Sequence, residues 1–494
     1  MLSRRRLAHV APALPVLSAL AVWHPLYRNN FHGDDFIHFY EILTKSLPQL
    51  LSRLWGGHLY IVGNAVFYCL FHVFGLDPRG YFLIVLATHL LNTALLYVVI
   101  RRFSGDRWLA CGGATLWGTC PTLQDVLAWF SAYGHVLLST IVLAVLADLG
   151  RVLEDSATVS SQRAGVWAIA MALGSMCFGT GLGLAAVFPL AAALALPRTQ
   201  LPWRSACVIA LGAAATIGVY ELFRAYSPEF FPWERLMTSV EVPVVPRALV
   251  LTGHLAAFGT TTILLGFVGL DRGYPNAVAT VTTTLAAVAV VAASWSATPR
   301  TRRRLLALGT LAVAAYGSVG LGRILLINAV HLSPSSAAST QLRWQYLPVA
   351  LLTVFLATAF AVLSARSPAA RRLVYAGAAL WTGARIVLLV LRPFAIDHWS
   401  QERAYCEGFV KMVSDRALAT PPGHVALIEN RPFAPTAVDP DALIGSVGAF
   451  VIFFPDDTIA GRTVRFAVDE HQWELAKERG GRVATLVVRA EPPR

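Results

Sequence analysis

Long apolar stretches separated by short polar segments make up most of the first 391 residues. A helix needs about 20 predominantly apolar residues to cross a bilayer, so this pattern predicts a bundle of about eleven transmembrane helices. The expected spans cover residues 7–26, 80–100, 108–121, 126–148, 165–178, 182–197, 203–222, 277–296, 305–327, 346–365 and 373–391. The predicted fold class is therefore mainly α, a polytopic transmembrane helical bundle.

Arginine clusters between these stretches orient the predicted spans. RRFSGDR (101–107), TPRTRRR (298–304) and RSPAARR (366–372) each connect two of them. Basic loops stay on the cytoplasmic side of a membrane, so we expect these segments and the N-terminus there. The loop 27–79 and the chain from residue 392 onward then face the outside.

Two further apolar segments are not counted as spans. Residues 248–270 are apolar enough to cross the membrane, but counting them would leave residues 298–304 outside. We therefore interpret 248–270 as a re-entrant or interfacial segment. Residues 58–75 are interrupted by two histidines and an asparagine, a pattern that favours a helix lying at the membrane interface.

The last part of the chain changes character. After a helix-like stretch at 399–416 come the apolar or alternating runs HVALIEN, AFVIFF and RVATLVV, which are typical of strands. We predict a small α/β domain over residues 392–494 on the extracytoplasmic side, following a transmembrane domain over residues 1–391.

Composition and charge agree with a membrane protein. The chain is 56% hydrophobic and 14% charged, whereas soluble domains carry about 25% charged residues. Residues 1–391 hold 28 basic and 14 acidic residues, and residues 392–494 hold 12 basic and 14 acidic ones. The positive excess lies in cytoplasmic loops, so it needs no nucleic-acid partner to explain it. The six cysteines show no paired spacing, so they indicate neither a disulfide framework nor a zinc site.

The first external loop contains the most unusual polar group, in NNFHGDDFIHFY (29–40). Asp34 and Asp35 could cap a helix that begins near Phe36. Alternatively, one carboxylate acts as a base or metal ligand while its neighbour orients it, because carboxylates beside a membrane are costly and tend to be functional. His32 and His38 flank the pair and could coordinate a metal or donate hydrogen bonds.

A third carboxylate faces the same compartment. Asp125, in PTLQDVLAW (121–129), falls in a short external turn between two predicted spans. It could cap a helix or share a site with Asp34, since the predicted topology puts both on one side of the membrane.

Two arginines are candidates for binding a phosphate. Arg343, in STQLRWQYLP (339–348), lies at the external start of a span beside Trp344 and Tyr346, and Arg323 lies within the preceding span. The aromatic residues could form an ordinary interfacial belt or contact a lipid donor, and Arg343 could extend to lipid headgroups. A guanidinium is also the usual partner of a phosphate, and a buried arginine such as Arg323 needs one.

Several short motifs occur in an order typical of one superfamily. HGDDF lies in the first external loop, followed by VFGLDPRGYF (73–82), THLLNTALLYVVIRR (88–102), TCPTLQDVLAW (119–129) and LRWQYLP (342–348). In this order the chain resembles the GT-C superfamily of polytopic membrane glycosyltransferases, in the branch of the protein O-mannosyltransferases and their bacterial relatives. Asp125 stands where a glutamate is usual.

The resemblance implies a fold, a reaction and a set of site residues. The resemblance implies an inverting transferase that moves a sugar from a polyprenyl-phosphate donor to an extracytoplasmic acceptor. On this basis Asp34 is the preferred base, Asp35 orients it or caps the next helix, and the two roles could be reversed. Asp125 could hold the base, bind the acceptor or share a divalent cation such as Mg²⁺ or Mn²⁺ with it. Arg343, with Arg323, would stabilise the leaving phosphate.

The chain also departs from the family pattern. Many relatives carry a Lys–Glu pair near the fifth and sixth spans, whereas FGTGLG (178–183) has neither residue, and Leu342 replaces the glutamate that usually precedes the arginine. The implied acceptor is a protein, lipid or polysaccharide. We expect the protein in the cell membrane (inner or plasma), and the Ala-, Arg- and Val-rich composition favours a bacterial origin. Two alternatives stay open: a transporter or flippase for lipid-linked saccharides, and a catalytically inactive relative in envelope assembly.

Overall fold

The computed structural model describes most of the helical part of the chain and short pieces of the C-terminal part. The described residues are 12–31, 34–52, 54–55, 57–226, 243–265, 276–329 and 333–391, followed by 411, 413–421, 424, 426–429, 458–459, 462–469 and 486–489.

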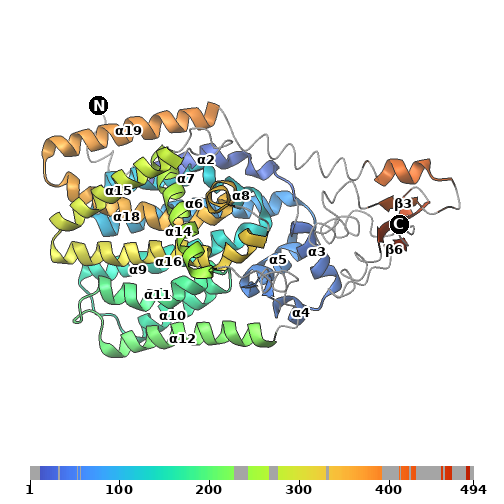
Figure 1. The fold of residues 1–494 in the computed structure, drawn as a ribbon, viewed down its shortest axis with the longest axis horizontal. Helices are drawn as coiled ribbons and strands as arrows, with labels where there is room; N and C mark the ends of the chain where they lie inside the picture. Colours follow the sequence, from blue (N-terminus) through green and yellow to red (C-terminus); the bar gives the residue numbers. More distant parts are fainter. Residues whose placement is uncertain are drawn as a thin grey trace.

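The described chain is mainly α-helical, and its long helices run side by side in a bundle (Figure 1). The first half contains α2 (Ala13–Trp23), η1 (His24–Arg28), α3 (Asp34–Thr44), α4 (Leu47–Leu51), β1 (Leu54–Trp55), β2 (His58–Leu59), α5 (Ile61–Phe74), α6 (Pro78–Ser104), α7 (Arg107–Gly118), η2 (Pro121–Leu123), α8 (Gln124–Ala128), η3 (Phe130–Ala132), α9 (Tyr133–Asp155), α10 (Ser161–Ser175), α11 (Thr180–Ala195) and α12 (Trp203–Tyr226). The second half contains α14 (Val244–Leu265), α15 (Asn276–Ser296), α16 (Pro299–Ala329), α17 (Pro334–Thr340), η5 (Leu342–Gln345), α18 (Tyr346–Ser364) and α19 (Pro368–Leu391).

The apolar pattern located the helices correctly. Every predicted span contains one, and within the described ranges seven helices are long and apolar enough to cross a membrane by length and composition. The chain is therefore a multi-pass membrane protein, although the total of about eleven spans stays a prediction. α6 lies in the centre and packs against α2, α7, α9 and α18.

The turn between α6 and α7 shows how the sequence ends one helix and starts the next. Gly105 has φ +72°, a left-handed conformation that glycine adopts without strain. Asp106 follows and caps α7 by accepting hydrogen bonds from the backbone N–H groups of Trp108 (2.8 Å) and Leu109 (3.1 Å). The tight hairpin brings the basic ends of both helices together.

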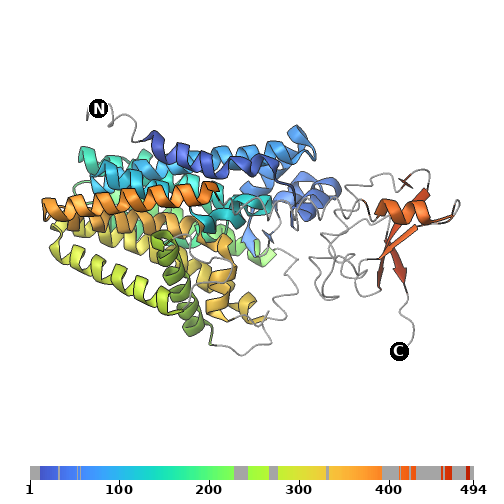
Figure 2. The same cartoon turned by 90° about the horizontal axis from the view of Figure 1, so that it is seen from above.

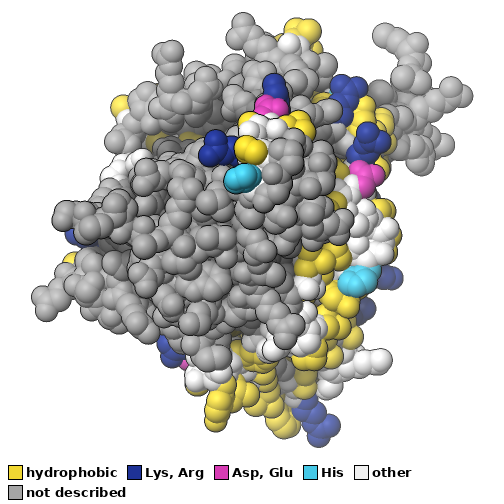
Figure 3. All heavy atoms as spheres, turned by 90° about the vertical axis from the view of Figure 1, so that its right-hand side faces the viewer, with side chains coloured by type: hydrophobic (Ala, Val, Ile, Leu, Met, Phe, Trp, Pro, Cys, Tyr) yellow, Lys and Arg dark blue, Asp and Glu magenta, His cyan; other side chains and the backbone are white. Residues whose placement is uncertain are grey.

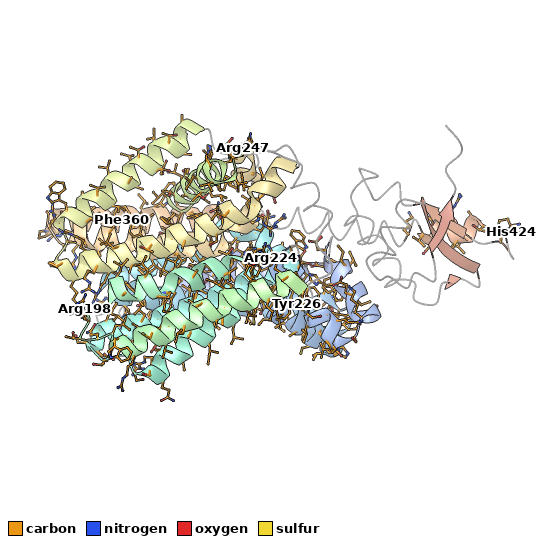
Figure 4. All side chains as sticks on the ribbon, turned by 60° about the horizontal axis from the view of Figure 1, so that its bottom comes forward. Arg198, Arg224, Tyr226, Arg247, Phe360 and His424 are labelled. Atoms are coloured by element: carbon orange, nitrogen blue, oxygen red, sulfur yellow. The ribbon has the colours of Figure 1, made fainter. Side chains whose placement is uncertain are left out.

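The two ends of the bundle differ in their polar residues. α3, α4 and α5 lie at one end (Figures 1 and 2). Arg198 lies at the other end, whereas Arg224 and Tyr226 at the end of α12 point toward the α3–α5 end (Figure 4). We call these the loop end and the basic end. The basic end contains the arginine-rich turns expected in the cytoplasm, but the absolute orientation, with a cytoplasmic N-terminus, stays a prediction.

The predicted interfacial helix corresponds to α5, a helix of 14 residues at the loop end. Leu43, Leu47, Val73 and Leu76 from this region have exposed side chains. Figure 3 looks onto the loop end and shows hydrophobic side chains gathered along its lower edge. Apolar residues that project from a short helix suit a position within the membrane interface.

α14 overlaps the segment that we interpreted as re-entrant or interfacial. It is a continuous helix of 22 residues, long and apolar enough to cross a membrane. However, it lies across the direction of the other long helices in two perpendicular views (Figures 1 and 2). Whether it spans the bilayer therefore stays open, and residues 266–270 lie outside the described part.

The C-terminal part contributes a short helical stretch at 413–419 and four strands: β3 (Ala426–Glu429), β4 (Thr458–Ile459), β5 (Arg462–Asp469) and β6 (Leu486–Arg489). β5 pairs in parallel with β3 and β6, and antiparallel with β4. HVALIEN and RVATLVV thus contain strands, whereas AFVIFF lies outside the described residues. The domain boundary at residue 392 and its extracytoplasmic location stay predictions.

Candidate functional site

The two adjacent aspartates begin α3 at the loop end and have different surroundings. Asp35 is fully buried, and its Oδ1 accepts hydrogen bonds from the backbone N–H of Ser131 (2.6 Å) and from its hydroxyl (2.5 Å). These bonds fix the start of α3 to η3, far away in the sequence. Asp34 is only partly buried. The two aspartates therefore differ in role. Asp35 holds the backbone at Ser131, whereas Asp34 belongs to the group of charged residues around Arg343 described below.

The role of Asp35 gives a prediction on stability. Asp35→Ala would leave two buried donors of Ser131 without their acceptor, at a cost of about 3 kcal/mol. We expect a lower Tm for the purified protein in detergent. Ser131→Ala is the matched control, because it removes only the hydroxyl donor and should cause a smaller loss. An unchanged Tm for Asp35→Ala would contradict this role.

Arg343 lies where three predicted site residues meet. It belongs to η5, and its Cζ atom lies 4.8 Å from the centre of the Trp129 ring. The carboxylates of Asp34 and Asp125 both interact electrostatically with its guanidinium. Asp125 belongs to α8, the short helix that ends at the residue before Trp129. The structure thus brings Asp34, Asp125 and Arg343 together from three distant segments.

Arg323 of α16 joins the same group. Its guanidinium interacts electrostatically with Asp34 and with Arg343, and its Nη2 donates a hydrogen bond to His58 Nε2. Its Cζ lies 5.9 Å from the centre of the Phe178 ring. Two guanidiniums thus lie beside the carboxylates of Asp34 and Asp125 at the loop end, and each guanidinium presents N–H donors that suit an anionic group.

Three residues that the sequence analysis did not predict surround Arg323. The ring of Phe178 lies 4.4 Å from the His58 ring and 3.6 Å from the His135 ring, centre to centre. Burial, with smaller contributions from the charges of Arg323 and His135, lowers the pKa of His58 well below its usual range. His58 is therefore neutral near pH 7 and can accept the hydrogen bond from Arg323. In the sequence, the position of His135 inside the apolar run YGHVLL was the one feature that could have marked it as a site residue.

The aromatic residues beside Arg343 lie in the core. Trp344 and Tyr346 are 2% and 0% exposed. The Tyr346 hydroxyl lies 2.8 Å from His89 Nδ1 and accepts a hydrogen bond from Asn92 at 3.3 Å. The structure thus brings Tyr346 to a buried polar network between α6 and α18, and not to the group around Arg343. The predicted contact of Trp344 and Tyr346 with a lipid donor stays a prediction.

Of the two histidines beside the aspartates, the structure describes only His38. His38 is buried, and its ring stacks on Phe67 with 4.5 Å between ring centres. It therefore belongs to the aromatic core of the loop end. His32 lies outside the described residues, and its predicted role in coordination or hydrogen bonding is untested.

A metal site is not formed by the described side chains. Within the described ranges, no group of three or more histidine, cysteine, aspartate or glutamate residues is placed to hold a metal ion. Asp34 and Asp125 offer the oxygen ligands that Mg²⁺ and Mn²⁺ prefer, but two carboxylates fall short of a complete coordination shell. A divalent cation at this site stays a prediction.

η3 is held from a second direction by Tyr60. Its hydroxyl donates a hydrogen bond to the backbone carbonyl of Ser131 at 3.0 Å, and burial raises the pKa of the Tyr60 hydroxyl above its usual range. Gly134 lies against the Tyr60 ring, where an added Cβ would come within 2.5 Å of Tyr60 Cε2. The turn between α8 and α9 is thus fixed by buried side chains from the first loop.

Comparisons with known proteins identify the fold. No protein-family model matches the chain, and no curated protein matches it. The chain is similar to ArnT from Cupriavidus metallidurans, in a crystal structure bound to undecaprenyl phosphate, with a TM-score of 0.51, 14% identity, and coverage of 96% of this chain and 89% of that one. It is also similar to the Archaeoglobus fulgidus oligosaccharyltransferase, solved with zinc and sulfate, with a TM-score of 0.43, 13% identity, and coverage of 98% and 62%.

The likeness to ArnT concerns the fold, because the two sequences share few identical residues. It confirms the predicted fold, a polytopic helical bundle that the chain shares with ArnT. The protein O-mannosyltransferase-like branch is not tested by it and stays a prediction.

Proposed function

We propose that the protein is an integral membrane glycosyltransferase that transfers a sugar, of hexosyl or mannosyl type, from a polyprenyl-phosphate donor to an extracytoplasmic acceptor. The observation that carries this proposal is the electrostatic coupling of Asp34 to both Arg343 and Arg323. This coupling supports the proposal because a carboxylate can accept a proton and a guanidinium is the usual partner of a phosphate. The acceptor is a protein, a lipid or a polysaccharide.

The reaction would proceed as a single displacement with inversion. Asp34 takes the proton from the acceptor hydroxyl or amide. At the same time the acceptor oxygen or nitrogen bonds to the anomeric carbon of the sugar, on the face opposite the phosphate. The bond between the anomeric carbon and the phosphate oxygen breaks, and both its electrons leave with the polyprenyl phosphate. Arg343 and Arg323 stabilise the charge that develops on this leaving group.

The surrounding residues would position these groups. Trp129 stacks against Arg343, and His58 holds Arg323 through a hydrogen bond. Asp125 also interacts with Arg343, so it can orient the guanidinium or bind the acceptor. Asp35 is already committed to Ser131, which supports Asp34 as the base of the pair.

The donor class draws support from the fold. ArnT, which shares this fold, was solved with undecaprenyl phosphate. A polyprenyl-phosphate sugar would place its lipid within the bilayer and its phosphate at the loop end, where the two arginines lie. On the predicted orientation, this end faces the outside of the cell membrane.

The proposal is tested by transfer assays with the purified protein in nanodiscs. A panel of radiolabelled polyprenyl-phosphate sugars is offered with lysed envelope fractions as a source of acceptor. We expect label from one donor to move to an acceptor, with release of polyprenyl phosphate. Donor binding without transfer would favour an inactive relative. Movement of the intact donor across liposomes would favour a flippase.

A further inference from the structure

A cavity lined by charged residues lies at the basic end, away from the candidate site at the loop end. Its volume is about 860 Å³, and its lining includes Arg101, Asp106, Arg107, Arg371 and Arg372. These residues come from the turn between α6 and α7 and from the start of α19. We call it the basic cavity.

Asp106, the one carboxylate among the described residues that line the basic cavity, is already engaged. The Tyr375 hydroxyl donates a hydrogen bond to Asp106, Arg371 Nη2 lies 3.8 Å from the same carboxylate, and the other Asp106 oxygen caps α7. Arg101, Arg107 and Arg372 have no ion pair with a carboxylate among the described residues. The cavity therefore presents an excess of positive charge, which is complementary to an anion.

An apolar groove continues from this cavity along the bundle. It has a volume of about 790 Å³ and lies between α7, α18 and α19, and Trp108 and Tyr375 line both spaces. Along α19 it runs from Val374 to Ile386, about 18 Å at the rise of an α-helix. This is somewhat more than half of the roughly 30 Å hydrocarbon core of a bilayer. Phe360, which lines the groove, lies toward the basic end (Figure 4).

Glycines leave the groove open. Gly112 of α7 and Gly377 and Gly383 of α19 line it, and an added Cβ at each would meet no protein atom within 4 Å. Larger side chains at these positions would therefore project into the groove without displacing the protein.

We propose that the basic cavity and the groove together bind one anionic phospholipid from the leaflet at the basic end. Its phosphate lies among Arg101, Arg107 and Arg372, and one acyl chain fills the groove. Basic pockets between transmembrane helices on the cytoplasmic side commonly take such headgroups. Trp108 and Tyr375 lie at the junction, where amphipathic aromatic rings sit at headgroup level. The bound lipid would join α19 to α7 and α18.

The acyl-chain half of this site is tested with Gly383→Leu in the full-length protein. Native mass spectrometry would compare retention of dioleoyl phosphatidylglycerol and of dioleoyl phosphatidylcholine. Because leucine fills the groove, phosphatidylglycerol binding should fall about tenfold or more. Gly218→Leu is the matched control, since Gly218 of α12 is equally open but outside the groove. Unchanged binding in Gly383→Leu would overturn the proposal. Gly377→Leu replaces Gly383→Leu if the latter fails to fold.

The headgroup half is tested by charge removal. Each of Arg101→Gln, Arg107→Gln and Arg372→Gln should weaken phosphatidylglycerol binding about fivefold, and the triple variant should lose the preference over phosphatidylcholine. Arg198→Gln, at the same end but outside the cavity, should leave both lipids unaffected. Inorganic phosphate should not displace the lipid. Displacement by phosphate, or equal retention of both lipids by the wild type, would overturn the assignment.

Discussion

Asp34→Asn is expected to lower the rate of sugar transfer by about 10²- to 10⁴-fold, the range that general base catalysis contributes. Asparagine has nearly the same shape as aspartate but cannot accept the acceptor's proton at neutral pH. Since Asp34 is only partly buried and Asp35 provides the bonds to η3, the variant should fold, with a Tm lowered only by the loss of the Asp34 charge beside the two arginines. The assay is single-turnover transfer from the active polyprenyl-phosphate sugar.

Donor binding separates a base from a binding residue in this variant. Asp34 interacts with both arginines, so its neutralisation leaves them with more charge for the donor phosphate. The Kd of the donor should therefore be unchanged or lower. Full transfer activity in Asp34→Asn would disprove its role as base, and a strongly raised Kd would assign it to donor binding.

Arg343→Ala should reduce transfer by about 10²- to 10³-fold, as is typical when a group that stabilises developing charge is removed. Arg343→Lys keeps the charge but loses the planar fork and the stacking on Trp129, so we expect an intermediate loss. Steady-state kcat and KM for the donor give the readout. A role in the transition state lowers kcat, whereas a role in ground-state binding alone raises KM.

The Arg343 variants need a control for folding, because Arg343 also faces two carboxylates. In Arg343→Ala, Asp34 and Asp125 lose a cationic neighbour, which costs stability as well as activity. Arg343→Lys retains that neighbour and should keep the wild-type Tm. If Arg343→Ala transfers sugar within twofold of the wild type, the guanidinium does not act on the leaving phosphate.

The sequence was sufficient to predict the helices and part of the candidate site. Apolar runs mark helices because the bilayer requires both apolar side chains and internal backbone hydrogen bonds. Arginine-rich turns then assign residues to one membrane side. That reasoning put Asp34, Asp125 and Arg343 in one compartment, and the structure places them in one electrostatic group.

Contacts between distant segments could not be predicted in the same way. The partner of Asp35 is a serine 96 residues later, and nothing in the local pattern distinguishes Ser131 from any other polar residue in a turn. The sequence is equally consistent with Trp344 and Tyr346 lying at the membrane interface or in the core, because only the packing of the helices determines their position. Tyr346 lies in the core because His89 and Asn92 bind its hydroxyl.

The bonds between Asp35 and Ser131 also set an order for biogenesis. A ribosome that adds about 5 to 20 residues per second needs about 5 to 20 s to synthesise the 96 residues between these partners. Throughout that interval Asp35 lacks the two Ser131 donors that fix α3 to η3. The first external loop can therefore form these bonds only after η3 has been synthesised, and any truncated translation product that ends before Ser131 would lack both donors for Asp35.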